Sequence, residues 1–328
     1  MLYTAKGQPS IMNIIPAFNL EDIDPALGTG VHPAFIVGGV QKSELFIGTH
    51  IGSVSEDELI SRPGVEPAHS RNHDQFVTLA RACGAGWHVM TNAEWSAVAL
   101  WSYKNGTMPR GNTDYGRSSD APHETARRMD LLEPGNTGGN PRTRTGSGPA
   151  TWRHDHTMHG ISDLCGNVWE LTPGMRIVDG EIHVIANNDA ALTATDLAAG
   201  SAAWRAIDGA TGELVAPGHA NAVKYAASGT AAYTLVHANL AYFESMANPG
   251  SPPVSAAALQ KLKAFGLFPV ANTGLGGDTF GYDLTGERLP VRGGGWYRGA
   301  LAGVFALDLS LPRSYASTLI GARPAFVI

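Results

Sequence analysis

Cysteine is nearly absent from this chain of 328 residues, which contains only Cys83 and Cys165. One disulfide is arithmetically possible, but two reduced, buried thiols are the state that we expect. The cysteines therefore provide no disulfide framework from which a fold could be inferred.

Charge is scarce as well, with 16% Asp, Glu, Lys and Arg and a net charge of −6. A weakly acidic chain gives no electrostatic reason to expect a nucleic-acid partner. Hydrophobic residues make up 43%, and 40 glycines and 20 prolines are typical of a compact, loop-rich protein and not of a disordered one.

Long apolar runs are also missing. None reaches the ~18 residues that a membrane span needs, so we expect no membrane insertion. The first seven residues have no basic segment leading into an apolar core, and we expect no signal peptide. These absences predict a location in the cytoplasm or within a larger particle.

Capping signals and apolar spacing predict three helices. Asn72 and Thr91 each precede a Gln or Glu by three residues, which is the pattern of a capping box. With the apolar positions that follow, they predict helices over about 72–83 and 92–104. A serine cap and a glycine stop predict a third helix over 255–265.

Strand patterns and composition predict the domain organisation. Two short apolar runs, 34–40 and 44–48, flank a polar turn and predict a hairpin. Residues 1–34 are interpreted as an N-terminal arm or first strand, and 35–328 as one domain. Residues from about 177 to 285 are interpreted as an insertion into that domain, because no linker-like composition bounds them.

The stretch 108–151 is predicted to be a long loop of Gly, Pro, Asn, Arg and Asp. It contains six arginines that could form a basic patch, although we expect them to pair with nearby acidic residues. The six are Arg110, Arg117, Arg127, Arg128, Arg142 and Arg144.

His154, Asp155, His156 and His159 resemble a metal site, since a His-x-His pair on a strand places both rings on one face. No Cys or Glu stands at ligand spacing, so structural or hydrogen-bonding histidines are the preferred interpretation. The sequence also lacks a Gly-rich phosphate loop, a Gly-x-Ser-x-Gly elbow and a His-Glu-x-x-His motif. We therefore expect neither a metal nor another cofactor.

Three motifs, in order along the chain, carry a family resemblance. They are residues 86–95 (GWHVMTNAEW), 163–171 (DLCGNVWEL), and the closing pair 292–296 (RGGGW) and 320–324 (IGARP). Together they resemble the formylglycine-generating-enzyme type of C-type lectin fold, over roughly residues 35–175 and 285–328. The resemblance implies an α+β, C-type-lectin-like fold with two helices on a small antiparallel sheet, many loops, a buried strand at 168–171 and the insertion.

Members of this fold family differ in what they carry on the scaffold. The formylglycine-generating enzymes use a pair of cysteines in the closing segment, whereas residues 293–328 contain none, so copper- and thiol-based oxidation lacks its residues. The related sulfoxide synthases place iron-binding histidines in a separate helical bundle, for which this chain has no room. Sugar-binding C-type lectins use Glu-Pro-Asn or Gln-Pro-Asp, and neither tripeptide occurs.

The closing segment instead resembles that of the variable proteins of diversity-generating retroelements, found in phages, bacteria and archaeal viruses. These elements randomise adenines, chiefly in AAC codons, which can then encode every residue except Met, Trp, Lys, Glu and Gln. Residues 293–328 contain no Met, Lys, Glu or Gln, and the single Trp296 stands at a scaffold position. The resemblance implies a non-catalytic ligand-binding protein with a variable segment at about 293–323.

Ten positions that alternate with Gly, Ala, Phe and Pro are the candidate ligand contacts. They are Tyr297, Arg298, Leu301, Asp308, Ser310, Leu311, Tyr315, Ser317, Thr318 and Leu319. The three leucines could instead be ordinary core residues, whereas the two tyrosines and Arg298 are the best anchors. Phe305 and Leu307 are assigned to the core, and Arg323 is expected to hydrogen-bond loop carbonyls as a clamp.

The expected partner is an unidentified protein or cell-surface ligand, bound from a virion tail or surface or in the cytoplasm. Other virion proteins are further candidate partners. Two alternatives stay open: a metal-dependent oxidase of the formylglycine-generating or sulfoxide-synthase type with displaced catalytic residues, and a structural virion protein whose closing segment packs against another subunit.

Overall fold

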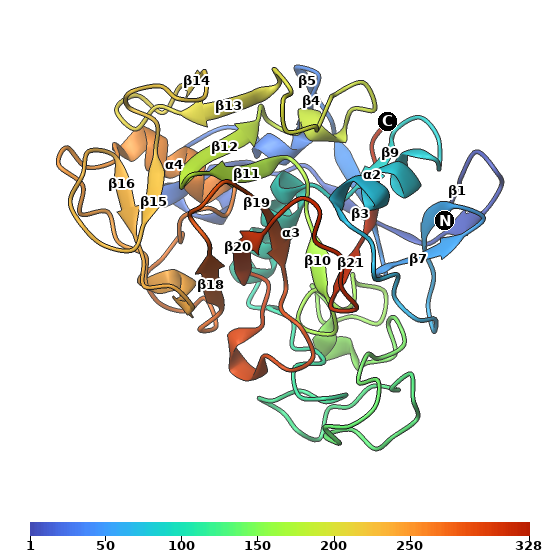
Figure 1. Cartoon of the computed structure of the whole chain (residues 1–328). Coiled ribbons are helices and arrows are strands. Elements are labelled where there is room, and N and C mark those ends of the chain that lie inside the picture. The colour runs from blue at the N-terminus through green and yellow to red at the C-terminus, as the bar shows by residue number, and fades with distance from the viewer.

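The computed structural model describes residues 1–328 and has an α+β fold in which strands and loops predominate (Figure 1). In α2 (His73–Arg81) the side chain of Asn72 accepts the amide hydrogen of the third helical residue, whose own side chain bonds back to the cap. α3 (Asn92–Lys104) begins in the same way behind Thr91, and α4 (Ala256–Ala264) begins behind a serine cap. The three predicted helices are confirmed.

A four-stranded antiparallel sheet joins the two ends of the chain. Its order is β3 (Met12–Pro16), β6 (Glu44–Gly48), β22 (Pro324–Phe326) and β9 (Trp87–Val89). α2 contacts β9, and residues of α3 share the main core cluster with Ile15, Leu45 and Ala325 of the sheet. Two helices and a small antiparallel sheet are thus associated, as predicted.

The hairpin predicted from residues 34–40 and 44–48 is wrong. β4 (Ile36–Val37) pairs with the residues directly after it, β5 (Val40–Gln41), through a turn at two glycines with positive φ. β6 pairs instead with β3 and with β22, near the C-terminus. The apolar run of β6 shows that it is a strand but carries no information about such distant partners.

The expectation of a small sheet alone is also corrected, because a second, mixed sheet has twelve strands. They are β10 (Trp169–Leu171), β11 (Met175–Val178), β12 (Glu181–Ile185), β13 (Trp204–Ile207), β14 (Leu214–Val215), β15 (Lys224–Ala226), β16 (Thr234–Val236), β17 (Ala241–Tyr242), β18 (Thr279–Tyr282), β19 (Glu287–Arg292), β20 (Leu307–Leu311) and β21 (Ile320–Ala322). Three of the pairs, β10–β21, β15–β16 and β18–β20, are parallel. Since β11 pairs with β19 and β18 with β20, the segment 177–285 and the closing segment share one sheet.

Short elements complete the fold. They are α1 (Leu20–Ile23), the hairpins β1 (Leu2–Tyr3) with β2 (Pro9–Ser10) and β7 (Gly52–Ser55) with β8 (Glu58–Ser61), and the 3-10 helices η1 (Pro25–Leu27), η2 (Pro33–Phe35), η3 (Ala150–Trp152), η4 (Asp189–Ala191), η5 (Phe243–Ser245) and η6 (Gly299–Leu301). None of the helices combines the length and the apolar character needed to traverse a bilayer.

Buried apolar side chains form one main cluster and three smaller ones. The main cluster includes Phe305 and Leu307, which confirms their assignment to the core. The second includes Trp169 of β10, and all three residues of β10 are buried, as predicted for this strand. Leu2 and Phe326 pack against the same small cluster, so the chain ends lie close together.

Both cysteines are free and buried, as expected. Burial raises the pKa of the Cys83 thiol to about 12 and raises that of Cys165 well above its usual value. Neither sulfur is therefore present as the reactive thiolate.

The loop between α3 and β10 has little regular structure and projects from the rest of the molecule at the bottom of Figure 1. Four of its arginines form ion pairs with acidic side chains. Three of these pairs lie within the loop, as expected, whereas Arg142 pairs with Glu66, which precedes the loop. The pairs are Arg110–Glu124, Arg117–Asp114, Arg128–Asp130 and Arg142–Glu66. These arginines do not form a free basic patch.

Candidate functional site

Buried side chains hold the start of the closing segment from the core side. Arg292, at the end of β19, donates to Asn92 Oδ1 at 2.7 and 3.1 Å and to Gly266 O at 2.9 Å. Trp95 Nε1 donates to Val304 O at 2.7 Å. α3 therefore fixes the closing segment through two of its own residues, on the side that faces away from solvent.

Arg323 holds the end of the same segment. Its side chain is completely buried and donates to Gly48 O and Ser162 O, both at 2.8 Å. It also forms a bidentate ion pair with Glu170, at 2.9 and 2.5 Å. Arg323 thus ties β10, β6 and a loop to the C-terminal strand, which confirms the predicted clamp.

Two glycines at the start of the closing segment allow close backbone packing on either side of η6. Gly293 and Gly294 both have φ of +87°. A Cβ at Gly294 would lie 2.4 Å from the Cβ of Ala302, and one at Gly293 would lie 2.9 Å from Leu164 O. No other residue fits at these two positions without movement of the backbone.

The ten candidate contact residues differ in exposure. Tyr297, Tyr315 and Thr318 are exposed; Arg298, Leu301, Ser310, Leu311, Ser317 and Leu319 are half-buried; Asp308 is buried. The two tyrosines each expose 38% of their surface, which is high for a large side chain. Nine of the ten can therefore meet a ligand at least in part.

The prediction that Asp308 is an exposed contact is wrong. β20 lies between β18 and β19, and Asp308 is only 9% exposed. Its Oδ1 accepts the amide hydrogen of Ser310 at 2.8 Å, and its Oδ2 lies 3.8 Å from the guanidinium of Arg298. Asp308 thus supports its neighbours within the sheet.

Two of the leucines have a partly structural role. Leu311 and Leu319 pack against the second core cluster, as expected if they were core residues. The backbone beside Leu319 is also held, because Arg142 donates to Thr318 O at 3.0 Å and Ser70 N donates to Ser317 O at 2.9 Å. The side chains of this turn reach solvent from a fixed main chain.

Aromatic and guanidinium groups cluster at the start of the segment. Arg298 lies over the rings of Trp169 and Tyr297, at 5.4 and 5.6 Å from their centres. Trp296 packs edge-on against Tyr297, and Arg142 lies over Trp296 at 5.8 Å. This stacking limits the rotamers of Tyr297 and Arg298, so these side chains would lose less entropy in any contact that they made.

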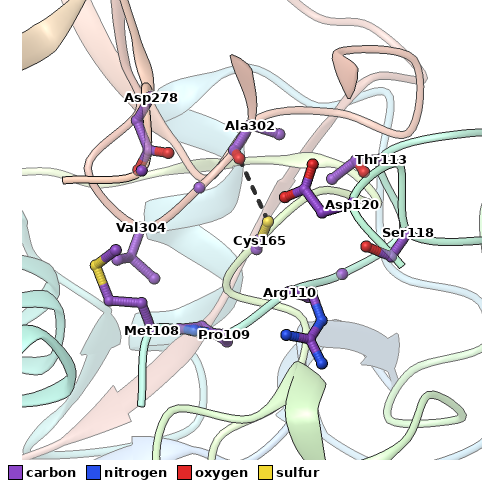
Figure 2. Close-up of a pocket in the computed structure, with 13 residues that line it drawn as sticks. Met108, Pro109, Arg110, Thr113, Ser118, Asp120, Cys165, Asp278, Ala302 and Val304 are labelled. Atoms are coloured by element: carbon purple, nitrogen blue, oxygen red, sulfur yellow. Dashed lines mark hydrogen bonds between the residues drawn. The ribbon is translucent and has the colours of Figure 1, made fainter. Parts of the chain in front are cut away.

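A cavity of about 100 Å³ lies next to η6, between the closing segment and the loop that follows α3 (Figure 2). Its walls include Asp278 from the end of the insertion, Asp120 and Arg110 from the loop, and Cys165 from the second motif. Cys165 Sγ lies 3.5 Å from Ala302 O. The cavity thus joins all three parts of the chain. None of the ten candidate contacts lines it, but Ala302, which follows Leu301 directly, does.

Asp278 is a buried carboxylate without a cationic partner. It is 4% exposed and forms no ion pair within 4 Å, although its Oδ2 accepts the amide hydrogen of Phe305 at 2.7 Å. Burial raises its pKa to about 7, and the charges of Glu244 and Asp120 act in the same direction. A Cβ at position 303 would lie 2.0 Å from Asp278 Oδ1, so the carboxylate needs glycine there.

Replacing Asp278 by asparagine should make the free energy of unfolding less dependent on pH. The carboxyl pKa rises from 3.8 in the unfolded chain to about 7 in the folded protein, so ionisation of Asp278 increasingly disfavours folding as the pH rises through this range. Asparagine carries no such charge and retains an oxygen for the amide of Phe305. Urea unfolding at pH 5 and pH 8 should show the variant gaining stability relative to the wild type at pH 8. A difference that is the same at both pH values would contradict the assignment.

His154 and His156 make separate hydrogen bonds within the fold, whereas the side chain of His159 is exposed. His154 is buried, and its Nδ1 accepts the amide hydrogen of Ile161 at 2.9 Å while its ring packs on Trp101. Burial lowers the pKa of His154 to about 4, so the ring is neutral at physiological pH. His156 Nε2 lies 3.3 Å from Met108 O. No three His, Cys, Asp or Glu side chains in the chain are grouped so that they could hold a metal ion.

Sequence reasoning missed the cavity and its carboxylate. Asp278 follows Gly276 and Gly277 directly before β18. These two preceding glycines are the only local signal that another part of the backbone approaches closely here. Its partner Gly303 lies in the closing segment, and nothing in the sequence places it beside Asp278. The sequence likewise gives no sign that Arg142 stacks on Trp296, because the two residues are far apart in the chain and only the fold brings them together.

No family model and no curated protein matches the sequence. The function is therefore inferred from the residues and the geometry of the chain itself.

Proposed function

We propose that this chain is a non-catalytic ligand-binding protein whose closing segment, about 293–323, is diversified by a retroelement. The scaffold would be a C-type-lectin-like fold of the formylglycine-generating-enzyme type. The contacts between the motifs support this fold, since β9 of the first motif pairs with β22, and β10 of the second pairs with β19 and β21 of the closing part. Motifs that are far apart in the sequence thus meet in space.

The observation that carries the proposal is the separation of roles within the closing segment. The positions interpreted as fixed, such as Gly294, the Ala302 to Leu307 run and Arg323, are buried. The positions interpreted as variable reach solvent, with the exception of Asp308. A surface side chain can change without repacking the core, so one backbone could present many different surfaces.

Tyr297, Arg298 and Tyr315 favour a macromolecular ligand. Tyrosine and arginine are enriched among the residues that dominate binding energy, and aromatic rings contribute a large contact area at low entropic cost. A protein or another cell-surface molecule is therefore the proposed ligand class, bound from a virion tail or surface or within a cell. The proposal includes no cofactor.

The oxidase alternative meets a physical obstacle at the thiols. The cavity contains only Cys165, whereas Cys83 belongs to a separate cluster beside Trp87. A two-cysteine oxidation needs adjacent, ionisable thiols, and burial raises the pKa of both. Metal analysis of the purified protein tests this point directly: stoichiometric copper or iron would favour the oxidase.

The proposed diversification by a retroelement can be tested in the DNA around the gene. A near-copy of the last ~100 bases, with AAC where the codons of the candidate contacts differ, should lie beside a reverse transcriptase gene. Without such a template the diversification has no source, and the proposal loses its main support. Sibling isolates should then differ at Tyr297, Arg298 and Tyr315 but not at Gly294 or Arg323.

Alanine at Tyr297, Arg298 or Tyr315 should weaken binding to the target by more than about 1 kcal/mol at two or more of the three positions. Each substitution removes an accessible ring or a stacked guanidinium from the proposed surface. Titration of each variant against cells or purified target that bind the wild type measures the loss. Tyr3→Ala is the matched control, because Tyr3 is 65% exposed and lies on β1, outside the closing segment. An equal loss in the control, or none in the three, would contradict the proposed surface.

A further inference from the structure

We propose that the cavity beside Ala302, the residue directly after η6, receives an organic cation, namely the ammonium or guanidinium group of a basic side chain on the ligand. The inference rests on the proposed binding function and adds a chemical preference to it. Exposed tyrosines alone give contact area without selecting charge, whereas a buried carboxylate selects a cation.

The charge balance of the cavity is the first argument. Asp278 and Asp120 lie on either side of Cys165 (Figure 2), and the charge of Glu244 also acts on Asp278. No cation forms an ion pair with Asp278, and only backbone amides, those of Phe305 and Ala306, oppose the rise in its pKa. A buried carboxylate that lacks a cationic partner is costly. A cation that enters the cavity would offset part of this cost, and the gain that exceeds the cation's own desolvation would appear as binding free energy.

The one cation in the wall does not neutralise Asp278. Arg110 forms a bidentate ion pair with Glu124, whose Oε2 also accepts from Trp152 Nε1 at 3.0 Å. Its positive charge is therefore balanced by a carboxylate outside the cavity. Cys165 adds no charge, because burial raises the pKa of its thiol well above the usual value.

The shape of the cavity is the second argument. A volume of about 100 Å³ accommodates several water-sized groups, so it can take the end of one side chain but not a folded peptide. Ala302, Gly303 and Val304 form one wall, and exposed Asp120 stands on the loop side. A side chain presented to this part of the closing segment could therefore enter next to Ala302, the residue directly after the candidate contact Leu301.

An organic cation fits this site better than a metal ion. Metal ions such as Ca²⁺ take six or more oxygen ligands, whereas Asp278 and Asp120 are the only carboxylates in the walls and no group of three metal-ligating side chains is present. The thioether of Met108 and the thiol of Cys165 form apolar walls that suit the methylene groups of a lysine or arginine side chain.

The test uses the full chain with n-butylammonium as the probe, n-butanol as its neutral counterpart and butylguanidinium as the second cation. The amide of Phe305, bonded to Asp278, is observed by NMR. We expect saturable chemical-shift changes of this amide with both cations and none with the alcohol. The cation with the lower dissociation constant identifies the preferred ligand group, lysine for n-butylammonium or arginine for butylguanidinium. Because the pKa of Asp278 is about 7, binding should be about tenfold tighter at pH 8 than at pH 6.

Asp278→Asn should abolish the shift caused by the cations, while Tyr3→Ala should leave it unchanged. Equal shifts with the alcohol, or tighter binding of Ca²⁺ or Mg²⁺ than of either cation, would overturn the inference. The outcome is separate from that of the proposed function, since the probe needs no target. Target binding that depends on Tyr297, in a protein that binds no amine, would contradict the cation site alone.

Discussion

Replacing Arg323 by alanine should lower the free energy of unfolding by about 3–5 kcal/mol, because one partner of a fully buried ion pair is removed. The Arg323 side chain is 0% exposed and the Glu170 side chain 1%. The change also leaves two carbonyl oxygens, of Gly48 and Ser162, without their donor. Urea unfolding measures the loss, and a marginally stable domain would not survive it.

Measuring the unfolding of Arg323→Ala at several pH values separates the effect of the lost charge from the effect of the lost packing. Burial raises the pKa of Glu170 to about 7 even beside Arg323, and loss of the guanidinium removes the main influence that lowers it. Ionisation of Glu170 then disfavours folding increasingly as the pH rises above its unfolded value of 4.5. Arg323→Ala should therefore be more destabilising at pH 8 than at pH 5, and adding Glu170→Gln should remove that pH dependence.

Arg117→Ala is the matched control for the arginine. Arg117 forms an ion pair with Asp114 at 2.7 Å, but both side chains are about one-third exposed. Exposed pairs of this kind contribute about 0–1 kcal/mol. A loss below about 1 kcal/mol for Arg323→Ala as well would show that the clamp is dispensable and that something else fixes the closing segment.

Local signals in the sequence predicted the helices correctly, because the atoms that start a helix are neighbours in the chain. Asn72 and Thr91 bond to residues three positions on, so four residues contain the whole capping box. The assignment of Phe305 to the core also agrees with the fold, because phenylalanine is among the residue types most often buried. Strand pairing is different, since β6 finds its partners in β3 and β22 at opposite ends of the chain. Nothing within residues 44–48 specifies them.

The candidate site was predicted correctly where exposure depends on local sequence, but not where it depends on strand pairing. The alternation of small and polar residues identified Tyr297 and Tyr315 as exposed, but it could not show that β20 is an inner strand, which buries Asp308. The twelve-stranded sheet depends on strands from the insertion, whose composition gives no register. The cavity depends on Asp278 and Gly303, which only the fold brings together.

The contrast between two groups of variants tests the proposed separation of roles. Phe305→Ala should lower the free energy of unfolding by about 3–5 kcal/mol, as large core aromatics usually do. Phe305 is 3% exposed and packs on Phe243, with the rings stacked at 6.4 Å, and on Tyr103. Trp169→Ala should cost a similar amount, since Trp169 is 3% exposed and also supports Arg298.

Tyr297→Ala and Tyr315→Ala should instead change the free energy of unfolding by no more than about 0.5 kcal/mol, as surface substitutions usually do. Both rings are 38% exposed, and neither belongs to a core cluster. Their removal leaves the fixing bonds of Arg292 and Trp95 intact, so the backbone of the segment should not move. Thermal melts of the four variants decide the question before any ligand is known. If the tyrosine variants melt as low as Phe305→Ala, these rings support the fold, and the ligand-binding surface must lie elsewhere on the molecule.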